Sequence, residues 1–131
     1  MQILLDTHAL IWFVNGEKYL PDSVGKVIPD INNKCFVSVG SLWEIAVKLS
    51  LEKLELKSDF KTLAKLLADN EIEILPISFE HIQKLLVLPF HHRDPFDRLI
   101  IAQGLVEKFT IITKDSNFAA YKVKVLWSRL N

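Results

Sequence analysis

The chain is short of cysteine and of net charge, and each shortage excludes a class of protein. Its one cysteine, Cys35, cannot form an internal disulfide framework, and no zinc-binding spacing surrounds it. Cys35 lies in the apolar stretch KCFVSV, which predicts a buried strand residue in a reducing compartment. The formal net charge is +0 at pH 7, so no overall basic field attracts nucleic acid. This balance does not exclude an enzyme that meets a polyanion through a bound metal.

Long hydrophobic runs and low-complexity segments are also missing. The longest apolar run near the N-terminus covers residues 9–14, whereas a membrane span needs about 18 residues. The N-terminus has no basic region, and Asp6 interrupts its apolar residues, so we expect no signal peptide and no membrane partner. A length of 131 residues suits one domain over residues 1–131. We expect a cytoplasmic protein.

Five short segments rich in Ile, Leu and Val are typical of strands. Most lack the polar alternation of a half-exposed strand, which favours a mainly parallel sheet covered on both faces. The expected strands are Gln2–Asp6, Cys35–Val39, Ile72–Ile77, Phe109–Asp115 and Val123–Trp127.

Helical spacing of apolar residues separates these strands. This alternation predicts a three-layer α/β/α sandwich with a mainly parallel central sheet. We expect Gly16 to end the first helix, and Asp59, Ser78 and Asp94 to cap three later ones. The expected helices are Ala9–Asn15, a short helix between Pro21 and Pro29, Ser41–Leu51, Phe60–Ala68, Phe79–Leu88 and Pro95–Lys108.

Four acidic residues fall at expected strand ends or helix starts. In a parallel α/β sheet these positions share one edge, where ligands bind at the topological switch point. Carboxylates that meet there repel one another, and a divalent cation removes that cost. Oxygen ligands of this kind suit Mg²⁺ or Mn²⁺. The four residues are Asp6, Glu44, Asp97 and Asp115.

Each acid also has a purely structural interpretation. Asp6 can cap the helix that follows it, and Asp115 can begin a turn. Glu44 lies three residues after Ser41, so SLWE can be a capping box.

The stretch HHRDPFDRLI, residues 91–100, contains the same ambiguity. Asp94 and Pro95 suit the start of a helix, and Asp97 would then complement the helix dipole from its first turn. His91 and His92 precede that start. No third residue gives them zinc spacing, so we interpret them as neighbours of a phosphate or partner at most.

Other side chains have less specific interpretations. We expect His81 on a solvated helix face, and the three tryptophans in a core or an interface. Lys48, Arg93 and Arg98 could contact an RNA backbone or pair with the acids, and the sequence does not choose between these roles.

Four motifs, taken together, resemble the PIN-domain proteins and, within them, the VapC-like toxin ribonucleases of type II toxin–antitoxin systems. They follow one another over nearly the whole chain: LLDTHALIW, VSVGSLWEIAVKLSLEKLEL, LPFHHRDPFDRLIIAQGL and IITKDSNFAAY. The resemblance implies an α/β/α sandwich whose acids bind Mg²⁺ or Mn²⁺ and which hydrolyses RNA as an endoribonuclease.

The resemblance also assigns roles to individual residues. Asp6 in LLDTH is similar to the first acid of the family, and Glu44 in SLWEIAVK to the second. Asp97 in DRLIIAQ is similar to the third acid, and Asp115 in TKDSNF to the fourth. Thr7 resembles a hydroxyl residue that supports the acids without binding metal. Asp94 is an additional acid whose role, accessory or helix cap, stays open.

The family further implies three partners: an RNA substrate, a small cognate antitoxin and a second copy of the chain. Trp12 and Phe13 are one candidate contact for the antitoxin. Three alternatives remain: a PIN relative that binds without cutting, a metal-dependent DNA nuclease, and a phospho-accepting receiver module. The receiver needs a pair of acids after the first strand, but Thr7 follows Asp6.

Overall fold

The computed structural model describes residues 1–16 and 20–127, and all strands in this part of the chain run parallel. They are β1 (Gln2–Leu5), β2 (Lys34–Ser38), β3 (Ile72–Leu75), β4 (Thr110–Ile112) and β5 (Val125–Leu126). Their order in the sheet is β3-β2-β1-β4-β5. The chain therefore winds from the central β1 to β3 on one side and then crosses to β4 on the other.

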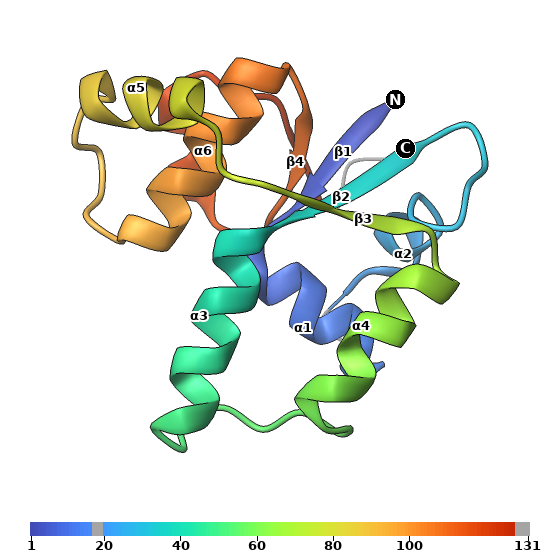
Figure 1. The fold of residues 1–131 in the computed structure, drawn as a ribbon. Coiled ribbons are helices and arrows are strands. Elements are labelled where there is room, and N and C mark those ends of the chain that lie inside the picture. The colour runs from blue at the N-terminus through green and yellow to red at the C-terminus, as the bar shows by residue number, and fades with distance from the viewer. Residues whose placement is uncertain (17–19, 128–131) are drawn as a thin grey trace.

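Helices cover both faces of this sheet, as Figure 1 shows. They are α1 (Thr7–Asn15), α2 (Asp22–Gly25), α3 (Val39–Ser50), α4 (Phe60–Asp69), α5 (Phe79–Val87), α6 (Pro95–Glu107) and the 3-10 helix η1 (Ser116–Tyr121). Helices α1 to α4 pack on one face, and α5, α6 and η1 pack on the other. The predicted α/β/α sandwich with a parallel sheet is confirmed. Within the described ranges, no helix has the length and apolarity to cross a membrane.

Alternate residues of each central strand enter opposite cores. In β1, Ile3 and Leu5 join the core under α1 to α4, whereas Leu4 joins the core under α5 and α6. In β2, Val37 and Phe36 divide in the same way. Both faces are buried, so the strands have no polar face, and the continuous apolar runs in the sequence follow from that.

Several predicted helix ends are confirmed. Gly16 ends α1 at a φ of 65°, in the left-handed region that glycine adopts without strain. The side chains of Asp59, Ser78 and Asp94 accept backbone N–H bonds at the starts of α4, α5 and α6. The predicted Ser41–Glu44 capping box is wrong. Helix α3 begins at Val39, because Ser38 accepts the Gly40 N–H at 3.0 Å and caps it.

Four of the strands are shorter than predicted, most clearly before Asp115, and β2 keeps its predicted length but begins one residue earlier. Strand β4 ends at Ile112, and its outer neighbour β5 pairs with it through two residues only. The Thr113 hydroxyl then accepts the Asp115 N–H at 3.0 Å and turns the chain away from the ladder. Asp115 therefore caps η1 and is not a strand residue.

Helix α6 approaches β4 closely because residue 104 is glycine. A Cβ atom on Gly104 would lie 2.7 Å from Ile111 Cδ1 and 3.2 Å from Val123 Cγ2. Ile111 is fully buried, so it has little room to move.

We predict that Gly104→Ala lowers the free energy of unfolding by about 1–3 kcal/mol, because the added methyl overpacks this contact. Urea denaturation measures the change. Gly25→Ala is the matched control, since its Cβ would meet nothing closer than 3.9 Å. Equal stability of the two variants would contradict the overpacking argument.

Candidate active site

Four acidic side chains gather where the sheet changes direction, at the carboxyl ends of β1 and β4. Asp6 follows β1, and Asp115 lies three residues after β4. Glu44 and Asp97 lie near the starts of α3 and α6, which meet this edge in Figure 1. All the other three acids act electrostatically on Asp97. The structure thus brings together side chains that are distant in the sequence.

Asp6 both caps a helix and faces this cluster. Its Oδ1 atom accepts the Ala9 N–H at 2.7 Å, and its Oδ2 atom accepts the Thr113 hydroxyl at 2.5 Å. The residue is 3% exposed, and this burial raises the pKa of its carboxyl despite the two hydrogen bonds. Capping and a role in the site are therefore compatible.

Glu44 is held from both sides. The Thr7 hydroxyl donates to Glu44 Oε1 at 2.7 Å and also lies 3.0 Å from Ser41 Oγ. Lys48 Nζ lies 2.7 Å from Glu44 Oε2, one helical turn further along α3. In the described part of the chain this is the one Lys or Arg ion pair that reaches the four acids. The cluster therefore keeps an excess of negative charge.

Asp97 shows the effect of that excess most clearly. Burial raises its pKa to about 7, and four nearby carboxylates add to the effect. They are, in decreasing order, Asp94, Asp6, Glu44 and Asp115. A carboxyl that holds its proton near neutral pH is typical of a site that binds a cation.

Asp94 lies beside Asp97 but is directed to the backbone. Its Oδ1 atom accepts the Asp97 N–H at 2.9 Å, as an N-cap does. The residue is exposed. Asp115 resembles it, because its Oδ1 atom accepts the Asn117 N–H at 2.9 Å. Asp115 nevertheless has an oxygen within 4.8 Å of ligand atoms of Asp97 and His92, whereas Asp94 contributes mainly its charge.

Two functional neighbours were missed by sequence reasoning. Thr113, which is 1% exposed, fixes Asp6, and only its place just after a strand could have suggested it. His92 lies with Asp97 and Asp115 in a group whose potential ligand atoms are all within 4.8 Å of one another. The search for zinc spacing overlooked His92, because its companions come from distant segments.

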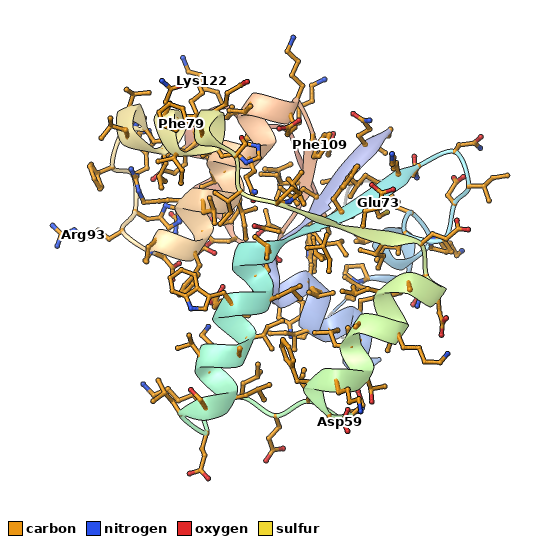
Figure 2. The ribbon with its side chains drawn as sticks, viewed as in Figure 1. Asp59, Glu73, Phe79, Arg93, Phe109 and Lys122 are labelled. Carbon is orange, nitrogen blue, oxygen red and sulfur yellow. The ribbon has the colours of Figure 1, made fainter. Side chains whose placement is uncertain are left out.

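The cationic side chains near the site now have separate roles. Arg98 is buried and donates to the carbonyl oxygens of Pro89 and Leu88 at 2.8 and 3.3 Å. Arg93 points away from the body of the molecule in Figure 2 and is exposed. Lys48 pairs with Glu44. Arg98 is therefore structural, whereas Arg93 is a solvent-exposed side chain.

One further expectation is wrong. His81 is 2% exposed, because it contacts Glu107 Oε2 at 2.7 Å where α5 packs on α6, and so it does not lie on a solvated face. Trp43, which we expected in a core or an interface, is 61% exposed and packs edge-on against Phe96 at 5.0 Å, so its place in an interface stays a prediction.

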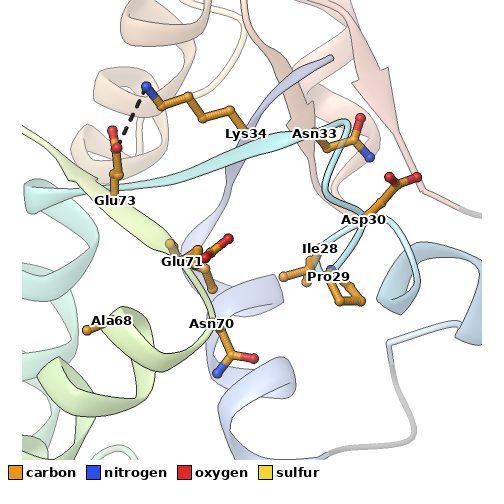
Figure 3. Close-up of a pocket in the computed structure, with 10 residues that line it drawn as sticks. Ile28, Pro29, Asp30, Asn33, Lys34, Ala68, Asn70, Glu71 and Glu73 are labelled. Carbon is orange, nitrogen blue, oxygen red and sulfur yellow. Dashed lines mark ion pairs between the residues drawn. The ribbon is translucent and has the colours of Figure 1, made fainter.

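A separate depression of about 460 Å³ lies at the opposite edge of the sheet, where β2 and β3 begin (Figure 3). Lys34 and Glu73 form an ion pair there at 3.7 Å, and both are more than half exposed. The charges of this depression are solvated, whereas Asp6 and Glu44 are buried. Charged side chains are thus buried at the carboxyl edge of the sheet and solvated at the opposite edge, which makes the carboxyl edge the candidate site.

The PIN-domain family model matches residues 3–124 of the chain. The chain therefore belongs to the PIN-domain family. This membership confirms the resemblance inferred from the four motifs and excludes the receiver module. No curated protein matches the chain at a significant level.

Solved structures agree with this fold. The chain resembles VapBC2 from Rickettsia felis, bound to a DNA fragment from its promoter, with a TM-score of 0.75 and 20% identity over 98% of this chain and 100% of that chain. VapBC-1 from nontypeable Haemophilus influenzae has a TM-score of 0.68 at 14% identity, covering 96% and 97%. FitAcB from Neisseria gonorrhoeae has a TM-score of 0.65 at 19% identity, covering 95% and 96%.

The raised pKa of Asp97 predicts how stability depends on pH. The unfolded chain loses this proton near pH 3.8, and the folded, metal-free protein loses it near 7. The folded state thus binds more protons between these values, so its free energy of unfolding should fall as pH rises from about 4 to 7. The Asp97 contribution to this fall is at most about 4 kcal/mol.

Asp97→Asn should flatten this fall and should exceed the wild type in stability at pH 8. Urea denaturation in EDTA at pH 5 and pH 8 measures it. The control is Asp59→Asn, which changes an exposed N-cap and should keep the wild-type slope. An unchanged slope in Asp97→Asn would show that the pKa of Asp97 is not raised in the folded protein.

Proposed function

We propose that the chain is a Mg²⁺- or Mn²⁺-dependent endoribonuclease, formed by one nuclease domain over residues 1–131, and the toxin of a toxin–antitoxin pair. The observation that carries the proposal is the burial of several carboxylates with one compensating lysine at the switch point of the sheet. PIN domains are nucleases, and the structural neighbours named above are toxin–antitoxin complexes. Both facts favour this function.

The donor set fits a divalent cation. It combines carboxylate oxygens, an excess of negative charge and one buried nitrogen atom that has no hydrogen-bond partner, His92 Nε2. When bound, such an ion would neutralise charge on the phosphate and lower the pKa of a water nucleophile. The residues that would hold it are Asp6, Glu44, Asp97 and Asp115.

The surrounding side chains hold these carboxylates in place. Thr113 and the Ala9 N–H occupy one lone pair on each oxygen of Asp6 and leave others for a ligand. Thr7 and Lys48 do the same for Glu44. Fixed ligands reduce the reorganisation that binding requires. Asp97 must lose its proton to become a ligand, so metal affinity should rise with pH through about 7.

RNA is the substrate that the exposed groups beside the acids favour. Trp43 precedes Glu44 on α3 and Phe96 precedes Asp97 on α6, and the two rings pack edge-on with centroids 5.0 Å apart. An exposed aromatic ring can stack on an unpaired base. Arg93 lies in the loop before α6 and can reach the backbone phosphates.

The partner proposals rest on exposed apolar residues. Helix α5 and the loop after it expose Phe79, Leu86, Val87 and Phe90 by 71–83%. A patch of this kind marks an interaction site, and we assign the homodimer to it. Trp12 and Phe13 line a groove of about 320 Å³ with Leu20, which remains the candidate antitoxin contact. A cytoplasmic location also stays a prediction.

Cleavage of labelled RNA in Mg²⁺ or Mn²⁺ tests the function. Asp6→Asn and Asp97→Asn should each lower kcat by more than the roughly 10- to 100-fold expected for loss of a residue that only supports a ligand. EDTA should abolish cleavage. Asp94→Asn is the matched control, because it keeps the cap acceptor and should keep most activity.

Cleavage that persists in EDTA or in both variants would refute the metal-dependent site. Faster cleavage of single-stranded DNA than of RNA would favour a DNA nuclease instead. RNA binding without any cleavage would favour a binding-only relative.

Trp43→Ala should raise KM for a single-stranded RNA about 5- to 100-fold, since stacking of one base contributes about 1–3 kcal/mol. Its kcat and its metal affinity should not change, because the ring lies outside the acids. Trp43→Phe should restore most of the affinity. Steady-state kinetics on one oligonucleotide separates the two constants, and a loss confined to kcat would contradict the stacking role.

A further inference from the structure

His92 is placed like a metal ligand, although the four acids already account for the family pattern. It belongs to the loop before α6, and its Nε2 atom lies 3.6 Å from Asp97 Oδ2. A ligand atom of Asp115 lies within the same 4.8 Å group. These three residues are one group of potential metal ligands in the part of the chain that the structure describes.

The Nε2 atom itself is buried and has no hydrogen-bond partner among the described residues. A buried polar atom without a partner is destabilising unless something outside the chain satisfies it. The fold therefore holds the imidazole in a position where the described residues leave Nε2 without a hydrogen bond. A ligand in the acidic cluster would satisfy it.

The other side of the ring is fixed by the fold. Tyr121 Oη lies 3.0 Å from His92 Nδ1 and accepts the backbone N–H groups of His91 and His92 at 3.0 Å each. The buried Arg98 donates to the same oxygen at 3.3 Å. Metal-binding histidines usually have their second nitrogen held in this way, which sets the orientation and the tautomer of the ring.

The distance between the two ligand atoms fits a shared ion. His92 Nε2 and Asp97 Oδ2 lie 3.6 Å apart, which is too far for a direct hydrogen bond. Two ligands of one ion, each about 2.1 Å from it, lie roughly 3 to 4.2 Å apart. Binding of an ion at Nε2 would place the ring proton on Nδ1, where Tyr121 Oη is the neighbouring atom.

We infer that His92 is a nitrogen ligand of the metal site together with Asp97 and Asp115, and that the site consequently prefers Mn²⁺ to Mg²⁺. Imidazole binds Mg²⁺ poorly, whereas Mn²⁺ accepts both carboxylate and imidazole ligands. This inference rests on the proposed metal site, but it concerns which atoms bind the ion and does not depend on the substrate.

Pulsed EPR of the Mn²⁺-loaded protein, without RNA, tests the assignment. Wild type should show nitrogen modulation from one directly bound imidazole, and growth on ¹⁵N-labelled histidine should change the modulation to that of ¹⁵N. His92→Gln should lose it and should bind Mn²⁺ about 10-fold more weakly by calorimetry, with less than about a 3-fold change for Mg²⁺.

His91→Gln is the matched control, because His91 is exposed and meets Tyr121 through its backbone N–H and the edge of its ring. It should keep the nitrogen modulation.

Wild type without nitrogen modulation, or modulation that survives in His92→Gln, would overturn the inference. The labelled wild type tests the nitrogen ligand even if His92→Gln does not fold. Nitrogen modulation without RNA cleavage would refute the nuclease alone, and cleavage without modulation would refute the role of His92 alone.

Discussion

Repulsion between carboxylates at one edge of the sheet is the constraint on which the site depends. Asp6 and Glu44 are almost fully buried, and Asp97 lies between them and two further acids. Only Lys48 offsets this charge through a Lys or Arg ion pair within the described residues. The fold maintains the arrangement because two apolar cores hold the strands and helices that carry the acids. The folded chain thus holds these carboxylates together at a cost in stability.

Hydroxyl groups hold the acidic side chains of the site in fixed positions. Thr7 connects α1 to α3 through Glu44, and Thr113 connects the end of β4 to Asp6 at the end of β1. Each joins segments that are distant in the sequence, so the acids keep their places without a metal. Tyr121 does the same for His92. Neutral hydroxyl groups therefore orient Asp6, Glu44 and His92, and the lysine pair at Glu44 removes only part of the negative charge of the site.

Much of this could be predicted from the sequence, and the errors have physical causes. Unbroken apolar runs predict strands buried on both faces, and cap residues such as Asp94 mark helix starts wherever they occur. Both patterns involve residues that are close in the sequence, so they can be recognised without the tertiary structure. The boundary errors at Asp115 and Ser41 arose because a side-chain hydrogen bond, from Thr113 or Ser38, decided where the element ended. His81 was misplaced because Glu107, its partner, lies on another helix.

The sequence by itself determined the fold class and the family, and it predicted the four acids of the site, because each depends on local patterns of residues. Only the tertiary structure decided how those acids interact. Burial and proximity, which raise the pKa of Asp97, depend on four segments meeting at one edge. The same is true of His92. Its unpaired nitrogen atom suggests a metal ligand only because the fold places it beside Asp97 and Asp115. Electrostatic energy depends on distance through space, and residue order does not record that distance.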